Sequence, residues 1–254
     1  MILNLYKNRG ETPLECIQRY RDAHLELKNE KFTYLGRLDP LAEGVLLVAS
    51  GDDVHRKEEF LNLDKQYEFV SIFGFATDSF DIMGKILRVE KVENINELEL
   101  IKIAEIYKGK REQKYPFYSS KTISKGGSKK QLHELAKMGV LDEDDLPTKE
   151  IEIYDLKFDG LTSLSSKEFF GRLLMDISRV KGDFRQHEIL VLWKKLLDSY
   201  NHPILLARWS ANVSSGTYIR SLVNDIGNTL GIGAVTLSIK RTKVGEFDII
   251  GSEK

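Results

Sequence analysis

Segments with the periodicity of β-strands and segments with the periodicity of helices are mixed along this chain without strict strand–helix–strand alternation. Residues 148–158 place apolar side chains mostly at every second position, whereas residues 165–180 and 187–200 repeat them every three to four positions. Further strands are expected at 2–6, 67–75, 85–89, 205–213 and 235–240, and further helices from Thr12, at 95–107 and at 217–230. This pattern predicts an α+β fold with a mixed or antiparallel central sheet and flanking helices.

The composition restricts the kind of protein. Hydrophobic residues make up 41% of the 254, enough for a sizeable core. The net charge is -1, so a polyanion could be bound only through local basic patches. The single Cys16 cannot form an intrachain disulfide, no Cys and His cluster has zinc spacing, and no apolar run approaches the ~20 residues that span a bilayer. We therefore expect a cytoplasmic monomer with no metal and no membrane partner.

Asp39 lies in the run GRLDPLAEG, directly before Pro40 and between Gly36 and Gly44. The proline disfavours helical backbone at Asp39, and the glycines permit tight turns or the close approach of another group. Taken alone, Asp followed by Pro fits an ordinary turn. The longer run resembles the catalytic segment of pseudouridine synthases, and its LDPLAEG part resembles the TruB family in particular.

Three further segments resemble TruB motifs, in the order in which the family has them. They read KQYEFVSIFGFATDSFDIMGKI, EQKYPFYSSKTISKGG and NVSSGTYIRSLVNDIGNTLGIGAVTLSIKR. With the Asp39 run they extend from about residue 7 to residue 245, nearly the whole chain. The resemblance implies a single catalytic domain of the pseudouridine synthase fold over residues 1–254, which converts uridine 55 in the T-loop of tRNA to pseudouridine.

The resemblance also assigns chemistry to three residues: Asp39 as the nucleophile, Arg220 as its partner, and Tyr67 as the tyrosine that stacks on the target base. The reaction breaks the C1′–N1 bond and joins C1′ to C5 of the same base, so no cofactor is expected. A carboxylate held ionised by a nearby cation suits it. Read without the resemblance, Arg220 fits a surface helix arginine and Tyr67 a strand residue with a buried ring.

Other family positions lie near the RNA. By resemblance, Asp81 is a carboxylate near the flipped nucleotide, Ile239 lines the uracil pocket and Arg241 lies behind it. Ile239 equally fits plain core. Asp78 also matches the family, although a turn cap is an equal interpretation of its place in TDSFD.

Residues 108–130 form a long basic excursion with eight Lys or Arg residues and one acid, a local excess of seven positive charges. Lysine-rich runs are usually solvated loops. Aromatic residues are interleaved here, however, and the resemblance makes this segment a thumb that holds RNA. The expected RNA contacts in it are Tyr118, Lys121, Lys129 and Lys130. Arg179, Lys181 and Arg185 form a second, weaker basic candidate.

The chain departs from the family pattern in several places. Tyr34 stands at the position of the usual histidine and Arg37 at that of an alanine, and both are expected to contact RNA. Lys7, in KNRGETP, matches a family lysine and is expected to support the site or to contact RNA, although a solvated strand end is an equal interpretation. We expect no C-terminal PUA domain, and a helical insertion at 160–202 that compensates with RNA-binding surface.

Three alternatives compete with this interpretation. GRLD also resembles ribosomal RNA pseudouridine synthases of the RsuA and RluA types, which lack the GTYIR motif. A non-catalytic module that binds or folds tRNA would explain the altered histidine. A glycosidase would pair Asp39 with Asp81 across a glycosidic bond, but no tryptophan platform accompanies them, since Trp193 and Trp209 have the setting of core residues.

Overall fold

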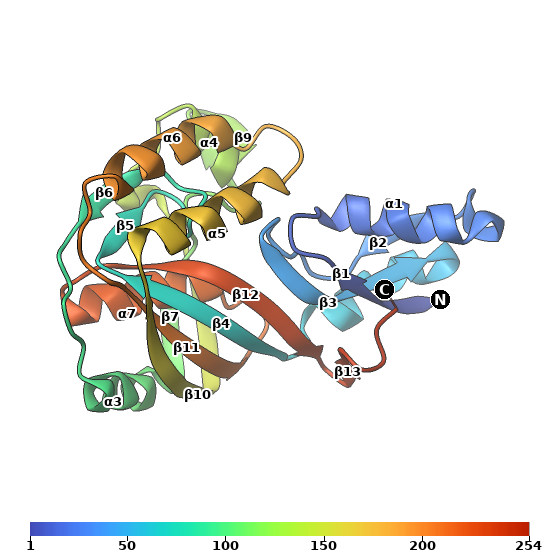
Figure 1. Ribbon diagram of the computed structural model, residues 1–254. Coiled ribbons are helices and arrows are strands. Elements are labelled where there is room, and N and C mark those ends of the chain that lie inside the picture. Colours follow the sequence, from blue (N-terminus) through green and yellow to red (C-terminus); the bar gives the residue numbers. More distant parts are fainter. Residues whose placement is uncertain (254) are drawn as a thin grey trace.

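The computed structural model describes residues 1–253 and is built around a nine-stranded mixed sheet (Figure 1). Seven strands follow one another in the order β1-β3-β12-β4-β11-β10-β7, while β2 pairs with β3 and β13 with β12. The strands are β1 (Ile2–Lys7), β2 (Phe32–Tyr34), β3 (Ala42–Ser50), β4 (Lys65–Phe73), β7 (Gly109–Lys114), β10 (Thr148–Leu164), β11 (Ile204–Val213), β12 (Ala234–Val244) and β13 (Phe247–Asp248). Two hairpins lie outside it: β5 (Phe75–Thr77) with β6 (Ile86–Val89), and β8 (Thr122–Lys125) with β9 (Ser128–Gln131).

Helices cover both faces of the larger half of the sheet. Here α3 (Glu97–Tyr107) and α7 (Ile219–Leu230) cover one face, and α5 (Ser166–Ser178) and α6 (Gln186–Leu197) cover the other. The remaining helices in residues 1–253 are α1 (Pro13–Ala23), α2 (Lys57–Leu61) and α4 (Leu132–Lys137), with short 3-10 turns at Leu25–Leu27, Gly51–Arg56 and Glu143–Asp145. Alternate residues of β11 face opposite sides: Leu205 and Ala207 pack with α3 and α7, whereas Ile204 and Leu206 pack with α5 and α6. Among residues 1–253, no helix is long and apolar enough to cross a membrane.

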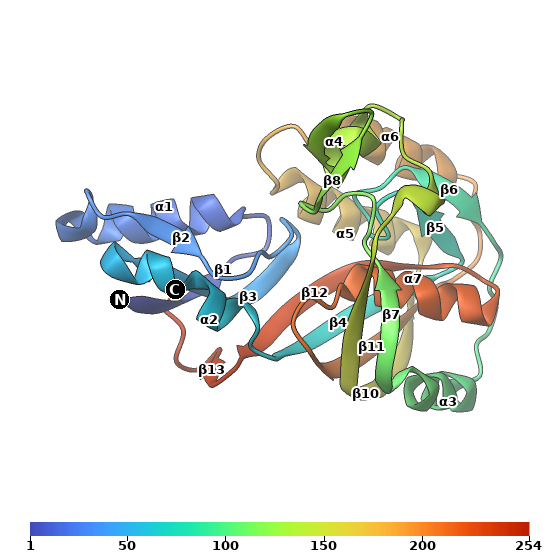
Figure 2. The ribbon, with the colours of Figure 1, turned by 180° about the vertical axis from the view of Figure 1, so that it is seen from behind.

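The N-terminal part forms a smaller lobe of α1, α2 and β1 to β3, and both chain ends lie there (Figures 1 and 2). Strand β12 joins the lobes, because Ile239 to Arg241 pair in parallel with Ala42 to Gly44 of β3. A Cβ atom at Gly44, which has a φ of +106°, would lie 2.2 Å from the Arg241 carbonyl oxygen. The glycine that closes the Asp39 run therefore permits the strand contact that joins the two lobes.

The predicted α+β architecture is confirmed, and so are the strands and helices expected from periodicity, within a few residues at their ends. Two predicted boundaries are wrong. Residues 109–114 are not part of a free excursion but form β7 at the sheet edge, and β10 runs to Leu164, so the helical pair begins only at Ser166. Trp193 and Trp209 are buried core residues, as expected.

Candidate active site

Asp39 and Arg220 meet at the junction of the two lobes. Asp39 lies in the loop before β3, and Arg220 is the second residue of α7. The Arg220 Nε donates to Asp39 Oδ2 at 2.8 Å and its Nη2 to Oδ1 at 3.2 Å, a contact to both carboxylate oxygens. The Arg220 side chain is 3% exposed and that of Asp39 is 34% exposed. The pair is thus anchored on its cationic side and open on its acidic side.

Arg220 is itself fixed by two backbone carbonyls. Its Nη1 donates to the oxygen of Ser79 at 2.7 Å and its Nη2 to that of Tyr118 at 3.2 Å. Burial alone would lower the pKa of Arg220, but the charges of Asp39 and Asp81 outweigh burial and the net shift is upward. The guanidinium is therefore a permanent cation beside Asp39, and its two hydrogen bonds fix the orientation of that carboxylate.

Asp81 is a second carboxylate at the same place. Its Oδ2 lies 3.8 Å from Arg220 Nε, while its Oδ1 accepts from Ser79 Oγ at 2.6 Å and from the Met83 amide at 2.9 Å. Burial raises the pKa of Asp81 despite the opposing effect of Arg220. Asp39 and Asp81 share one arginine, and Asp39, the more exposed of the two, is the one bonded through both oxygens.

Lys7 and Arg241 hold the Asp39 loop from behind. The fully buried Lys7 donates to the carbonyls of Asn8, Pro40 and Ala42 at 3.1, 3.2 and 2.5 Å, and burial lowers its pKa to about 8. The 2%-exposed Arg241 donates to the carbonyls of Val45, Arg37 and Gly36. Neither side chain presents a surface to solvent, which excludes a solvated strand end for Lys7, and both side chains support the Asp39 loop from within the protein.

A hollow opens beside the Asp39 carboxylate. Its walls come from the Asp39 loop, the turn after β5, α7 and β12, and its lining residues are Asp39, Leu41, Ala42, Asp81, Arg220, Thr236, Leu237, Ser238 and Ile239. Ile239 is 8% exposed and belongs to the main core cluster, which confirms the core interpretation, while its contact with a uracil stays a prediction. The Thr236 hydroxyl oxygen is buried and has no hydrogen-bond partner among the described residues, and no motif singled it out in the sequence.

Tyr67 is not among the residues that line the hollow. It lies on β4, in register with Arg241 and Ala211 of the neighbouring strands, and is 8% exposed. Its ring belongs to the same core cluster as Ile239. The buried-ring interpretation is confirmed, and the stacking role stays a prediction.

Tyr118 is the thumb residue that reaches the site. Its carbonyl binds Arg220, and its hydroxyl donates to Asp78 Oδ2 at 3.1 Å. Burial and the nearby Asp78 charge raise the pKa of Tyr118 to about 12, so it stays protonated. Asp78 also accepts from the Lys85 amide at 2.8 Å, which confirms its turn-capping role.

The other predicted RNA contacts lie away from Asp39. Lys121 and Lys129 are exposed on the hairpin of β8 and β9 or next to it, and Lys130 is half-buried with its ammonium near Met138 Sδ. Tyr34 lies on β2 beneath the ammonium of Lys57, and it does not line the hollow. Arg37 has an exposed side chain two residues before Asp39. Tyr34 and Arg37 thus remain predictions for RNA contact.

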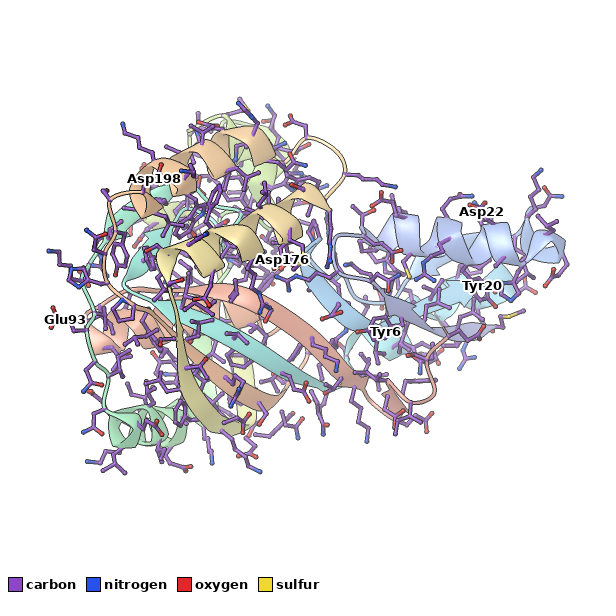
Figure 3. The ribbon with its side chains drawn as sticks, in the orientation of Figure 1. Tyr6, Tyr20, Asp22, Glu93, Asp176 and Asp198 are labelled. Carbon is purple, nitrogen blue, oxygen red and sulfur yellow. The ribbon has the colours of Figure 1, made fainter. Side chains whose placement is uncertain are left out.

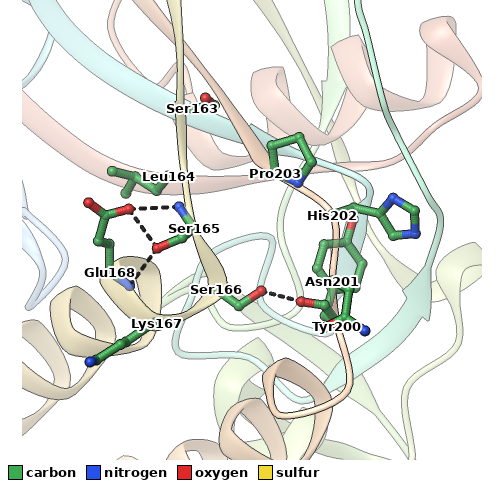
Figure 4. A pocket seen from close by; sticks show the side chains of 10 residues that line it. All are labelled: Ser163, Leu164, Ser165, Ser166, Lys167, Glu168, Tyr200, Asn201, His202 and Pro203. Carbon is green, nitrogen blue, oxygen red and sulfur yellow. Dashed lines mark hydrogen bonds between the residues drawn. The ribbon is translucent and has the colours of Figure 1, made fainter.

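A second hollow, of about 530 Å³, lies at the start of α5 (Figure 4). Ser165 caps that helix through Glu168, and Ser166 donates to the Tyr200 carbonyl. None of its lining residues belongs to the Asp39 cluster. The Ser165, Ser166 and Glu168 side chains in its lining are thus already engaged in hydrogen bonds that hold the start of α5.

Comparison with known proteins agrees with this geometry. Residues 24–184 match the model described as TruB family pseudouridylate synthase (N terminal domain). The chain is 33% identical over 248 residues to tRNA pseudouridine synthase B of Thermosipho melanesiensis, covering 97% of this chain and 64% of that protein. It is 31% identical to tRNA pseudouridine synthase B of Endomicrobium trichonymphae, covering 98% of this chain and 86% of that protein. The chain thus spans less than two thirds of the Thermosipho protein.

Solved structures share the fold at lower identity. A crystal structure of a Cbf5-Nop10-Gar1 complex superposes with a TM-score of 0.57 at 19% identity, over 97% of this chain and 49% of that one. A structure of an H/ACA RNP bound to a substrate RNA containing 2′-deoxyuridine gives a TM-score of 0.53, also at 19% identity. The family match covers well over half of the chain, and the Asp39 and Arg220 motifs meet in one place. This chain belongs to the TruB family of pseudouridylate synthases.

Proposed function

We propose that this protein isomerises uridine to pseudouridine in the T-loop of tRNA, at position 55, with Asp39 as its nucleophile. One observation supports the proposal above the others. The partly exposed carboxylate of Asp39 is held by both oxygens on a buried arginine, beside a hollow lined by Ile239 and Thr236; the Thr236 hydroxyl has no hydrogen-bond partner within residues 1–253.

The chemistry needs one base to be detached and rejoined through a different atom. The C1′–N1 bond breaks, C1′ bonds to C5, the proton on C5 leaves and N1 gains a proton. Asp39 attacks the reacting nucleotide, and the Arg220 guanidinium holds the carboxylate in a fixed orientation. The Ile239 side chain packs against the base, while Tyr67 contributes its ring from the adjoining core. Asp81 orients Arg220 from its other side.

The target base must leave the RNA stack before it can reach Asp39. The segment of 115–137, with its exposed Lys121 and Lys129, is proposed to bind RNA phosphates, with Tyr118 at its base. The expected partner is the T-arm of tRNA, bound by a monomer in the cytoplasm. Arg37, exposed beside the Asp39 loop, is proposed to contact the same strand.

The test uses an unmodified tRNA transcript that carries tritium at uracil C5. Formation of the C1′–C5 bond expels that hydrogen, so release of label to water measures the reaction directly. We expect release that disappears when the T-loop uridine alone is replaced by cytidine. Release that survives this replacement would move the substrate elsewhere, for example to ribosomal RNA. Salt-dependent binding without any release would indicate a non-catalytic RNA-binding module.

A further inference from the structure

The loop between α5 and α6 presents one arginine in a fixed way. Gln186 closes this loop, because its Nε2 donates to the carbonyls of Val180 and Gly182 at 2.9 and 2.7 Å. Arg185, the residue before it, has a φ of +64°, a conformation that favours glycine. Residues other than glycine are uncommon in this conformation.

The Arg185 side chain reaches two other segments. Its Nη1 and Nη2 donate to Oδ2 and Oδ1 of Asp78 at 2.8 and 3.3 Å. Its guanidinium carbon also lies over the Tyr118 ring, 4.6 Å from the centroid, and the Tyr118 hydroxyl donates to the same Asp78. One side chain of the helical pair thus joins the turn after β5 to the base of the thumb.

These are the two segments that orient the catalytic arginine. Of the carbonyls that accept from Arg220, one belongs to Tyr118 and the other to Ser79, the residue after Asp78. Arg185 therefore fixes the Tyr118 carbonyl through the Tyr118 ring, and the Ser79 carbonyl through the side chain of the preceding residue, Asp78. From Arg185, contacts continue through Ser79 and Tyr118 to Arg220, and from Arg220 to the Asp39 carboxylate.

The helical pair is fixed at its other end as well. Figure 3 places Asp176 on α5 at the boundary with the smaller lobe. There it is 2% exposed and accepts from Arg9 Nη2 at 2.8 Å. Arg9 also donates to the carbonyls of Leu41 and Leu237, and both of these residues line the hollow beside Asp39. Helices α5 and α6 are therefore anchored to the walls of the site on two sides.

We infer that Arg185 is a positioning residue for pseudouridine formation: it fixes the Ser79 and Tyr118 carbonyls that aim Arg220, and through it Asp39. This inference rests on the proposed function. It assigns to the helical pair a role in supporting the active site, in place of the RNA-binding surface that the basic residues of this region predict. The Arg185 side chain is 20% exposed and its charge is already paired with that of Asp78. Little surface and little net charge are therefore left for binding a phosphate.

Two variants separate these roles. Arg185→Gly removes the side chain while tolerating the positive φ, so the loop conformation is retained. Arg185→Lys keeps the charge but loses the paired contact to Asp78 and the stacking on Tyr118. Lys195→Ala removes one positive charge from the exposed side of α6 and serves as the matched control. The measurements are the single-turnover rate of tritium release at saturating tRNA, the Kd for tRNA at several salt concentrations, and the thermal unfolding midpoint.

We expect both Arg185 variants to lose at least about tenfold in saturating rate, because small displacements of a reacting group are costly, with Kd changed less than about threefold. The control should match the wild type in both. A normal rate in folded Arg185→Gly would overturn the inference. A normal rate with weakened tRNA binding in Arg185→Gly, and restored binding in Arg185→Lys, would also overturn it, because that result identifies a phosphate contact. An inactive wild type would instead contradict the proposed function. Failure of the proposed function is thereby distinguished from failure of the inference about Arg185.

Discussion

Replacement of Arg220 by lysine tests how far the reaction rate depends on the orientation of the Asp39 carboxylate. The guanidinium makes four contacts in the structure: two to the separate oxygens of Asp39 and one each to the carbonyls of Ser79 and Tyr118. A lysine ammonium is a point charge with three donors on a flexible stem. It preserves the charge beside Asp39 but cannot hold both carboxylate oxygens in a fixed plane.

The expected loss follows from this change. A displacement of a reacting group by about 1 Å costs roughly 100-fold in rate. That factor corresponds to about 2.7 kcal/mol, since each tenfold equals about 1.36 kcal/mol. The free energy of unfolding should also fall, but by less than the ~3–5 kcal/mol that follows removal of one partner from a buried ion pair, because the charge is kept.

The assay is single-turnover release of tritium from C5-labelled tRNA with the enzyme in excess and above its Kd. Arg208→Lys, on the exposed side of β11, is the matched control and should behave as the wild type. Urea unfolding measures how much of Arg220→Lys is folded at the assay temperature. A folded Arg220→Lys that reacts within about threefold of the wild type would refute the argument that the two-oxygen contact aims Asp39.

Three further predictions concern the frame and the RNA surface. Gly44→Ala should lower the free energy of unfolding by about 2 kcal/mol or more, because its Cβ would meet the Arg241 carbonyl at a φ of +106°; an unchanged urea midpoint would contradict this. Burial lowers the pKa of Lys7 from 10.5 to about 8, so the unfolded chain binds more protons between these values. The stability of the wild type relative to Lys7→Met should therefore rise from pH 8 to 10.5, and parallel curves in urea unfolding would count against it. Replacing Lys121 and Lys129 together by alanine should reduce the slope of log Kd against log salt by roughly two, measured by filter binding, while an unchanged slope would remove them from the RNA surface.

Periodicity predicted most of the sheet but missed β3 and β7, whose sequences lack an alternation of apolar and polar residues. Strand β3 is buried at every position except Glu43, so its sequence lacks the alternation by which a strand is recognised. Strand β7 reads GKREQK and is polar throughout, because it pairs at the sheet edge with β10 and buries little more than Gln113. Both strands are determined by pairing with distant segments rather than by local pattern.

The motifs predicted the central Asp39 and Arg220 pair of the site but not the contacts that hold these two residues in place. Asp39 and Arg220 were identified by the runs around them, although 181 residues separate them. The contact of Arg185 with Asp78 joins residues 107 apart and carries no motif, so only the folded chain reveals it. Lys7 lies in a run that resembles a family motif, but its burial, and hence its support of the Asp39 loop, depends on how β1 packs behind that loop.

The most direct test of the account is tritium release by Asp39→Asn, compared with the wild type on the same C5-labelled tRNA. The amide keeps the shape of the carboxylate, and Asp81 remains 3.8 Å from Arg220 to offset its charge, so the variant should fold. The account predicts no detectable release by Asp39→Asn, with the Kd for tRNA within a few-fold of the wild type. Release within tenfold of the wild-type rate would show that Asp39 is not the reacting carboxylate.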